Sequence, residues 1–312
     1  MHKNEIENIP NLFIVGAAKA GTTSLYHYLN EHKDIYMCPI KEPNFFGKDI
    51  DWNKFDENYK RKTKLDFEDY LNKSILEEKH IVFVPKLDFY LKLFKNKPTN
   101  VKYIGEASTT YLYSKEAADE IYNFNKHAKI IIILREPVDR IISHYFMDLG
   151  GSSQKEENPF KAIKKDYETT NKGWGVSHLY IELSLYYEQV KRYLEVFPRE
   201  QILILNYSTL KNDKDEFLKT VFSFLELKLT EDVLSSSQKT FNQTLLPKNI
   251  LVRRLLSLKK IVPKSLVKFA KSKSSFLFKT KNDFDITDET KSYLRDETQK
   301  DWEATKEQYL KN

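Results

Sequence analysis

Cysteine is almost absent from this chain of 312 residues, where Cys38 stands alone. A single cysteine excludes an internal disulfide and a multi-cysteine zinc site, and it suits a reducing compartment such as the cytosol. Long apolar runs are missing too, since the longest, 130–134, is far shorter than the roughly 18 residues that cross a bilayer. The first ten residues contain two glutamates and no apolar block, unlike a signal peptide. We therefore expect a cytoplasmic protein without a membrane span.

Acidic residues are missing from the stretch 248–281, which holds eleven lysines and arginines. The net charge of the whole chain is +6, so the remaining residues carry −5. This segment predicts either peripheral contact with a membrane or polyanion, or amphipathic helices whose lysines are simply solvated. We interpret 248–312 as a basic, helical C-terminal extension of a single domain over 1–312, and we expect no nucleic-acid partner.

Glycine is scarce as well, with eight in the chain, and two of them, Gly16 and Gly21, bracket one short stretch. Before it lies the apolar run 11–15, which is typical of a buried strand. After it, 22–30 has apolar residues at helical spacing behind a start of hydroxyl residues. The pattern predicts a strand, a glycine loop and a helix.

Similar apolar runs alternate with helical stretches along the rest of the chain. Further strands are expected at 101–105, 129–134 and 201–206, and helices at 114–126, 138–149, 178–197, 213–225 and 287–310. The stretches 150–158 and 169–175 are expected to be loops. Strands that alternate with helices predict an α/β fold of three layers, with a central parallel sheet and helices on both faces.

Residues 16–24 read Gly-Ala-Ala-Lys-Ala-Gly-Thr-Thr-Ser. A loop between a first strand and a helix presents unpaired backbone N–H groups and the positive end of the helix dipole, and both attract anions. The glycines have the spacing of the ATP-binding loop G-x-x-x-x-G-K-[ST], but Thr22 follows the second glycine and the lysine, Lys19, comes earlier. The loop predicts a phosphate site and disfavours an ATPase.

The stretch 13–47, FIVGAAKAGTTSLYHYLNEHKDIYMCPIKEPNFFG, resembles the start of the sulfotransferases that use 3′-phosphoadenosine-5′-phosphosulfate (PAPS). The resemblance implies a P-loop-NTPase-like fold, PAPS as donor, adenosine 3′,5′-bisphosphate as product and no metal ion. Lys19 would also stabilise the leaving phosphate, because sulfuryl transfer needs positive charge there. By the same resemblance, the residues that grip the 5′-phosphosulfate are Lys19, Ala20, Gly21, Thr22, Thr23 and Ser24.

A second basic anchor follows the expected strand 129–134. Arg135 leaves the carboxyl end of this strand, where ligands bind in α/β folds, and Ser143 lies about two helical turns further along. An arginine fork and a hydroxyl group together suit a phosphate. The arrangement resembles the family's 3′-phosphate motif and implies that role for both residues. The alternative is a helix-capping arginine beside a solvent-exposed serine.

The segment 41–46, Lys-Glu-Pro-Asn-Phe-Phe, resembles the K-E-x-x-F-F segment of heparan-sulfate-type and bacterial sulfotransferases. The glutamate of that segment is the family's catalytic base, so the resemblance implies this role for Glu42 and a contact of Lys41 with the acceptor or the sulfuryl group. Otherwise Glu42 is one of many surface glutamates. The segment 105–108 resembles the family's G-E-K-S, but Ala107 replaces the lysine.

These features predict a PAPS-dependent sulfotransferase that acts by in-line displacement on a hydroxyl or amine of a saccharide or glycoconjugate. Two alternatives stay open. An ATP-dependent kinase of P-loop fold, acting on a nucleotide or small molecule, would bind ATP and magnesium. A non-catalytic polyanion- or membrane-binding protein would keep a nucleotide pocket without using Glu42.

Overall fold

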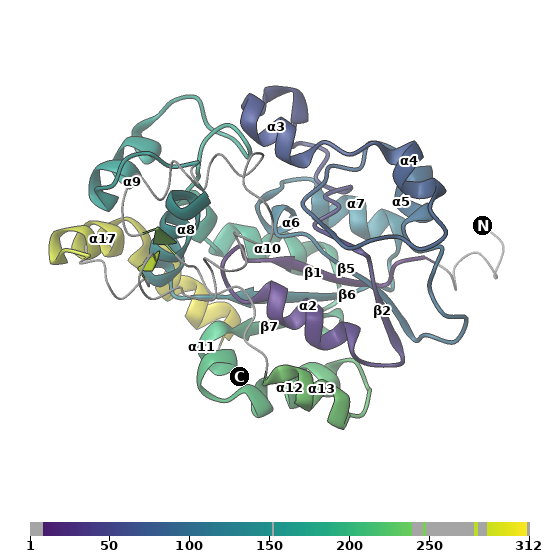
Figure 1. Cartoon of the computed structure of the whole chain (residues 1–312). Helices are drawn as coiled ribbons and strands as arrows, with labels where there is room; N and C mark the ends of the chain where they lie inside the picture. Colours follow the sequence, from purple (N-terminus) through teal and green to yellow (C-terminus); the bar gives the residue numbers. More distant parts are fainter. Residues whose placement is uncertain (1–8, 152, 239–245, 248–277, 280–285, 311–312) are drawn as a thin grey trace.

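A parallel sheet of five strands, in the order β2-β5-β1-β6-β7, forms the centre of the protein (Figure 1). The structure is a computed structural model that describes residues 9–151, 153–238, 246–247, 278–279 and 286–310. The predicted parallel sheet is confirmed, although β2 was not expected. The strands of the sheet are β1 (Leu12–Gly16), β2 (Ile35–Met37), β5 (Tyr103–Ala107), β6 (Lys129–Leu134) and β7 (Ile202–Asn206).

The central strands β1 and β6 are buried on both faces of the sheet. Residues 12–15 and 130–134 all have an exposed fraction of 0%. A strand without a polar face shows a continuous apolar run in the sequence instead of alternation, which explains why both were predictable. The register pairs Phe13 with Ile130 in parallel, so the carboxyl ends of β1 and β6 reach the same edge of the sheet.

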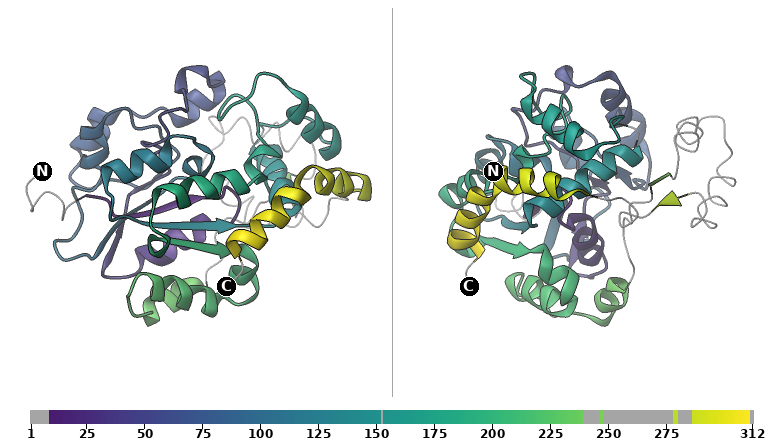
Figure 2. Two further views of the ribbon diagram at one scale, coloured as in Figure 1. Left: turned by 180° about the vertical axis from the view of Figure 1, so that it is seen from behind. Right: turned by 90° about the vertical axis from the view of Figure 1, so that its left-hand side faces the viewer.

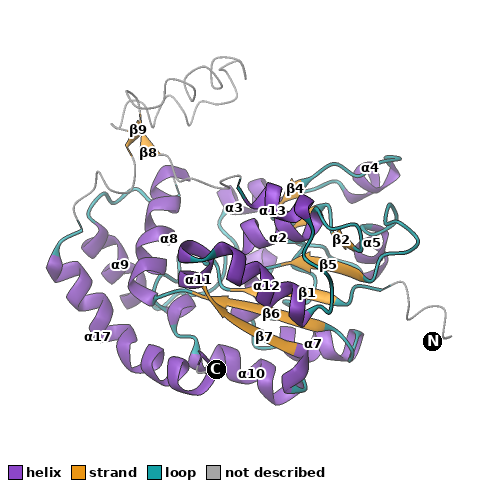
Figure 3. Ribbon diagram, turned by 90° about the horizontal axis from the view of Figure 1, so that it is seen from below, coloured by secondary structure: helices purple, strands orange, loops and turns teal. Residues whose placement is uncertain are grey.

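Helices cover both faces of the sheet, as predicted (Figure 1, Figure 3). One face carries α2, α12 and α13, and the other carries α6, α7 and α10. Within these layers, α13 packs on α2, and α10 packs on both α6 and α7. The bounds of these helices are Thr22–Asn30 for α2, Thr110–Tyr113 for α6, Ala117–Phe124 for α7, Tyr187–Val196 for α10, Lys214–Phe224 for α12 and Glu231–Ser237 for α13.

A second apolar cluster joins three helices beside the sheet: α8 (Pro137–Gly151), α9 (Pro159–Glu168) and α17 (Asp288–Thr305). Ile163 of α9 and Leu294 of α17 are both fully buried in it. Figure 2 shows α17 running along α8 and α10, and these helices are in contact. The C-terminal helix is thus a structural part of the fold rather than an appendage.

The remaining elements are short. β3 pairs with β4 in parallel, and β8 pairs with β9 in antiparallel fashion. Beyond α17 the chain continues as a π-helical segment, so the helix expected over 287–310 is confirmed. The bounds are Ile40–Lys41 for β3, Lys79–His80 for β4, Leu246–Pro247 for β8, Phe278–Lys279 for β9, Glu57–Thr63 for α3, Phe67–Asn72 for α4, Leu87–Lys92 for α5, Tyr207–Asn212 for α11, Trp52–Lys54 for η1, Glu182–Ser184 for η2, Arg199–Gln201 for η3 and Lys306–Leu310 for η5.

The helix predicted over 178–197 is wrong in its first half, since α10 begins only at Tyr187. The backbone N–H groups of His178 and Tyr180 both donate to the carboxylate of Asp166, at 2.8 and 3.1 Å. Between them Leu179 has a φ of 55°, which no helix allows. The loop expected over 150–158 begins later than predicted, because α8 extends to Gly151. The helix α9, which follows this loop, was not predicted.

The basic segment 248–281 lies almost entirely outside the described residues, so its contact with a membrane or polyanion stays a prediction. The same holds for the single domain over 1–312 and for a cytoplasmic location. Within the described ranges, no helix is both long and apolar enough to cross a bilayer.

Candidate active site

The loop between β1 and α2 lies at the carboxyl edge of the sheet. Gly21 precedes α2 with a φ of 91°, a left-handed conformation that costs glycine little. No described side chain caps this helix, so the N–H groups of its first turn are available to a ligand. A methyl group added at Gly21 would lie 2.6 Å from Cδ2 of Leu210, so the loop must pass close to that side chain. This geometry supports the predicted anion site.

Lys19 lies in the middle of the loop with a φ of 68°. Burial, followed by the positive charge of Arg135, lowers the pKa of its ammonium group to about 8. The negative charges of Asp148 and Glu42 act on this pKa in the opposite direction. A half-buried cation of this kind gains from an anionic ligand, which would raise its pKa again.

Arg135 meets Lys19 at this edge. Its Nη1 donates to the backbone oxygen of Lys19 at 3.0 Å, and its guanidinium carbon lies 4.6 Å from the centre of the Tyr207 ring. Its Nε is buried and has no hydrogen-bond partner among the described residues. A buried donor without a partner is costly, so the guanidinium fits a phosphate that would pair with it.

The structure therefore brings Lys19 and Arg135 together, although 116 positions separate them. Thr22 is buried at the start of α2, while Thr23 and Ser24 are half-buried beside it. Ser143 is half-buried on α8, about two turns beyond Arg135. The roles assigned to these hydroxyl groups stay predictions.

Glu42 follows β3, and its carboxylate is almost completely buried. Lys41 Nζ donates to its Oε1 at 2.8 Å, Thr109 Oγ1 donates to its Oε2 at 3.2 Å, and His80 Nε2 lies 3.8 Å from Oε1. Burial by itself would raise the pKa of Glu42, but the charges of Lys41 and His80 and these hydrogen bonds hold it below its ordinary value. The side chain is therefore ionised at neutral pH and can accept a proton. Lys41 is buried against this carboxylate, and its predicted contact with the acceptor stays a prediction.

Three residues of the candidate site have strained backbone conformations. Lys19, Glu42 and Asn44 have φ values of 68°, 67° and 52°, in the left-handed region that residues with a Cβ avoid. Such conformations persist only where the surroundings impose them, and they concentrate at functional sites. Their grouping around the loop and the segment 42–44 supports the site.

Glu106 supports the segment 42–44 through Ser108, a role that the sequence did not assign. Its fully buried carboxyl accepts hydrogen bonds from Tyr90 OH at 2.7 Å, Tyr111 OH at 3.0 Å and Ser108 Oγ at 2.7 Å. Burial raises its pKa to about 7. Ser108 Oγ in turn accepts the backbone N–H of Asn44 at 3.1 Å. The resemblance of 105–108 to G-E-K-S marked this segment without giving Glu106 a role, and a glutamate beside the predicted apolar strand was a further signal.

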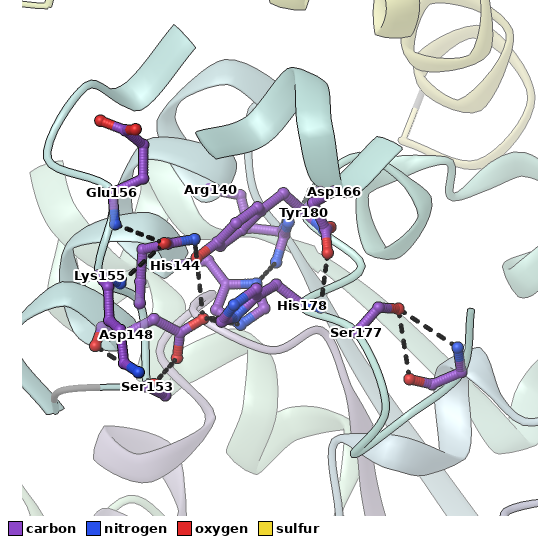
Figure 4. A network of polar contacts seen from close by, with 12 residues as sticks. Arg140, His144, Asp148, Ser153, Lys155, Glu156, Asp166, Ser177, His178 and Tyr180 are labelled. Carbon is purple, nitrogen blue, oxygen red and sulfur yellow. Dashed lines mark hydrogen bonds and ion pairs between the residues drawn. The ribbon is translucent and has the colours of Figure 1, made fainter. Parts of the chain in front are cut away.

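A second polar cluster on α8 was also missed (Figure 4). Arg140 is fully buried, and it donates to the backbone oxygen of Tyr180 and to Ser184 Oγ. His144, one turn further on, lies between Arg140 and Asp148: its Nδ1 is 3.4 Å from Arg140 Nη1 and its Nε2 is 3.5 Å from Asp148 Oδ2. Burial lowers the pKa of His144 to about 3, so this histidine is neutral.

Asp148 completes the cluster by pairing with His178, 30 positions away, at 2.7 Å. Burial would raise the pKa of Asp148, but the two histidines hold it below its ordinary value, so it is ionised. No spacing in the sequence links these residues. Among the described residues, no group of histidine, cysteine, aspartate and glutamate side chains is arranged to hold a metal ion. The predicted metal-free chemistry stays a prediction.

A parallel sheet whose first strand passes through a glycine loop into a helix N-terminus, with a basic side chain at the end of the neighbouring strand, defines a P-loop-like nucleotide-binding protein. Within this class, the chain belongs to the sulfotransferase family. The family model matches residues 10–232, a range that includes the loop, Glu42 and Arg135. The family predicted from the sequence is confirmed.

Known relatives agree with this assignment. The chain is 25% identical over 222 residues to heparan sulfate glucosamine 3-O-sulfotransferase 5 of Homo sapiens, which covers 71% of this chain and 55% of the relative. Carbohydrate sulfotransferase 15 of Homo sapiens is 25% identical over 256 residues, with 70% and 44% covered. A solved sulfotransferase structure from Alicyclobacillus acidocaldarius is 26% identical, with a TM-score of 0.65 and 97% of both chains covered. The chain spans about half the length of the curated relatives it matches.

Proposed function

We propose that this protein transfers a sulfuryl group from PAPS to a hydroxyl or amine of a saccharide or glycoconjugate and releases adenosine 3′,5′-bisphosphate. Family membership supports the reaction class, and the names of the heparan sulfate and carbohydrate sulfotransferases among its relatives support the acceptor class. The proposal depends on the contact of Lys19 with Arg135 and on the ionised Glu42, whose backbone N–H donates to Ala107 O at 2.8 Å, at the end of the strand β5 that pairs with β1.

The residues at this edge divide between the two phosphate groups of the donor. The N–H groups at the start of α2 and the ammonium group of Lys19 would hold the 5′-phosphosulfate. Arg135, whose Nε has no partner among the described residues, and Ser143 would hold the 3′-phosphate. When bound, PAPS supplies a sulfuryl group on a phosphate leaving group.

The chemistry that the protein must supply is proton removal and charge stabilisation. Glu42 can take the proton that the acceptor oxygen or nitrogen loses as it bonds to sulfur. Lys19 can neutralise the charge that collects on the phosphate oxygen as its bond to sulfur breaks. The hydrogen bonds from Lys41 and Thr109 keep the carboxylate of Glu42 oriented and ionised throughout.

Transfer from ³⁵S-labelled PAPS to a panel of oligosaccharides, lipids and phenols tests the proposal. The variant Glu42→Gln should still bind adenosine 3′,5′-bisphosphate but lose transfer by roughly 100-fold or more, because it cannot accept the proton. Glu57→Gln is the matched control, since the Glu57 side chain is 87% exposed on α3 and should leave transfer unchanged.

Each part of the proposal can fail separately. Labelling of lipids or phenols but of no saccharide would contradict the acceptor class. Transfer by Glu42→Gln at the wild-type rate would contradict the role of Glu42 as the base. Preferential binding of ATP with magnesium would favour the kinase, whereas binding of adenosine bisphosphate without transfer to any acceptor would favour the non-catalytic alternative.

A further inference from the structure

His178 lies beside the proposed site with its ring held in place on several sides. Nδ1 is paired with Asp148 Oδ2 at 2.7 Å, and the ring stacks on Tyr180 with centroids 4.9 Å apart and 3° between the planes (Figure 4). The backbone is held as well, because the N–H group of His178 donates to Asp166 at 2.8 Å. A ring oriented in this way loses little conformational freedom when it binds a ligand.

The carboxylates around His178 are used within the protein. Besides His178, Asp148 accepts hydrogen bonds from Tyr180 OH and Ser153 Oγ, both at 3.1 Å. Asp166 accepts the backbone N–H groups of His178 and Tyr180. In contrast, the His178 side chain is 26% exposed, and no described residue forms a hydrogen bond with its Nε2. The cluster therefore offers a ligand the Nε2–H of this imidazole rather than a carboxylate.

The charge of His178 suits an anion. Burial would lower its pKa, but the hydrogen bond and negative charge of Asp148 raise it above the ordinary value. The charged and titratable groups around His178 are Asp148 and His144 of α8, Asp166 of α9, Tyr180 of its own segment and Asp56 before α3. Arg140 is the other cation of the cluster, but it is fully buried and donates to the backbone oxygen of Tyr180 and to Ser184 Oγ. The partly exposed ring of His178 is therefore the cation that a ligand can reach.

The position of His178 points to the acceptor rather than to the donor. The segment that leads to His178 packs on Tyr59 of α3, because Trp174 Nε1 donates to Tyr59 OH at 3.1 Å. Tyr59 packs on Phe83 with ring centroids 6.5 Å apart, and the backbone N–H of the adjacent Val82 donates to the backbone oxygen of Glu42 at 2.9 Å, so this segment adjoins the one that carries Glu42. Asp148 is also about 7.5 Å further along α8 than Ser143, away from the sheet edge where the phosphates would bind.

We infer that His178, oriented by Asp148, binds a carboxylate of the acceptor through a hydrogen bond from Nε2–H. The inference rests on the proposed function. A carboxylate is the anionic group that a saccharide carries before any sulfate is added, so a uronic acid residue next to the sulfated position is the chemistry that fits. Asp148 acts as a positioning residue, since it reaches the acceptor only through the imidazole.

The experiment uses the full chain, PAPS and two probes: a tetrasaccharide of alternating glucuronate and N-acetylglucosamine, and the same tetrasaccharide with its carboxylates reduced to alcohols. The variant His178→Phe keeps a flat ring on Tyr180 but removes the N–H donor. For the first probe its KM should rise roughly 10- to 100-fold with kcat little changed, as expected for a lost hydrogen bond between charged groups. His127→Phe, at an exposed histidine, is the matched control and should change neither constant.

Three further measurements distinguish binding from a structural role. The affinity for adenosine 3′,5′-bisphosphate should be equal in His178→Phe and in the wild type. The KM of the wild type for the carboxylate probe should rise as the pH passes the pKa of His178, and this rise should vanish in His178→Phe. The variant His178→Asn retains a neutral N–H donor, so it should show an intermediate KM without that pH dependence.

The outcomes separate this inference from the proposed function. Equal KM values of the wild type for the two probes, or a loss of bisphosphate affinity in place of acceptor affinity, would overturn the role of His178 and leave the sulfotransferase intact. Transfer to neither probe would overturn both the saccharide acceptor and the carboxylate contact. If His178→Phe does not fold, His178→Asn decides the question. A KM and a pH profile of His178→Asn equal to those of the wild type would overturn the inference.

Discussion

The affinity for adenosine 3′,5′-bisphosphate should fall as the pH rises through the pKa of Lys19. Burial and the charge of Arg135 lower this pKa to about 8 in the ligand-free protein. A bound phosphate would raise it, because an opposite charge favours the protonated lysine. Because the pKa of Lys19 is higher in the complex than in the free protein, its contribution to binding is complete at pH values below the free-state pKa. The contribution is lost progressively as the pH rises above the free-state pKa.

The size of the effect follows from the titration. With a pKa of about 8, about nine-tenths of the free protein carries a protonated Lys19 at pH 7 and about one-tenth at pH 9. The dissociation constant should therefore rise about tenfold between these two pH values. The ligand itself contributes little, since the second ionisation of a phosphate, with a pKa of about 6, is nearly complete in this range.

Isothermal titration calorimetry across this pH range measures the effect, and repeating it in buffers of different ionisation heat counts the protons taken up. Lys19→Arg is the matched control: arginine stays charged throughout, so its pH dependence should disappear. Lys19→Met should bind weakly at every pH. A wild-type dissociation constant that stays within about twofold, or an undiminished slope in Lys19→Met, would refute the place of Lys19 in the anion site.

Three other predictions concern the frame of the site. Arg135→Ala should weaken binding of adenosine 3′,5′-bisphosphate by roughly 10- to 100-fold but hardly affect binding of its 3′-dephospho analogue. Equal weakening for both ligands, measured by calorimetry, would contradict the contact of Arg135 with the 3′-phosphate. Glu106 has a folded-state pKa of about 7, above the unfolded value of 4.5, so the free energy of unfolding should fall by about 3 kcal/mol as the pH rises through this interval. Urea unfolding should show that Glu106→Gln abolishes this dependence, and a dependence that persists would contradict the assignment. Gly21→Ala should destabilise the fold by more than about 1 kcal/mol, because Gly21 has a φ of 91°. Gly151→Ala serves as its control in thermal unfolding, because among the described residues the added methyl group would meet only Ser153 Oγ, at 4.0 Å.

Local features of the sequence were sufficient for the sheet and for the glycine loop. The strand 129–134 and the helix 22–30 have the bounds that the apolar patterns predicted. Both patterns are local consequences of burial, since a strand covered on two faces must be apolar throughout and a helix on one face of a sheet must be apolar on one side. Topology then placed Arg135 at the same edge as Lys19, because parallel strands end together.

Non-local hydrogen bonds account for what the sequence could not predict. The start of the expected helix 178–197 has ordinary helical spacing, yet Asp166 captures the N–H groups that a helix would have used. The short strand β2 was missed because its three residues are too few to establish a pattern, and only its pairing with β5 defines it.

By itself, the sequence determined the class of fold, the family and the positions of Lys19, Glu42 and Arg135, because each depends on neighbours within a few residues or on the common edge of a parallel sheet. Only the tertiary structure decided how these groups are charged. The depressed pKa of Lys19 depends on burial and on Arg135, and the ionised state of Glu42 depends on His80 and Thr109 as well as on the adjacent Lys41. Likewise, Asp148 and His178 form a pair only because the segment after α9 returns to α8. Protonation depends on burial and on distances through space, and neither is written in the order of the residues.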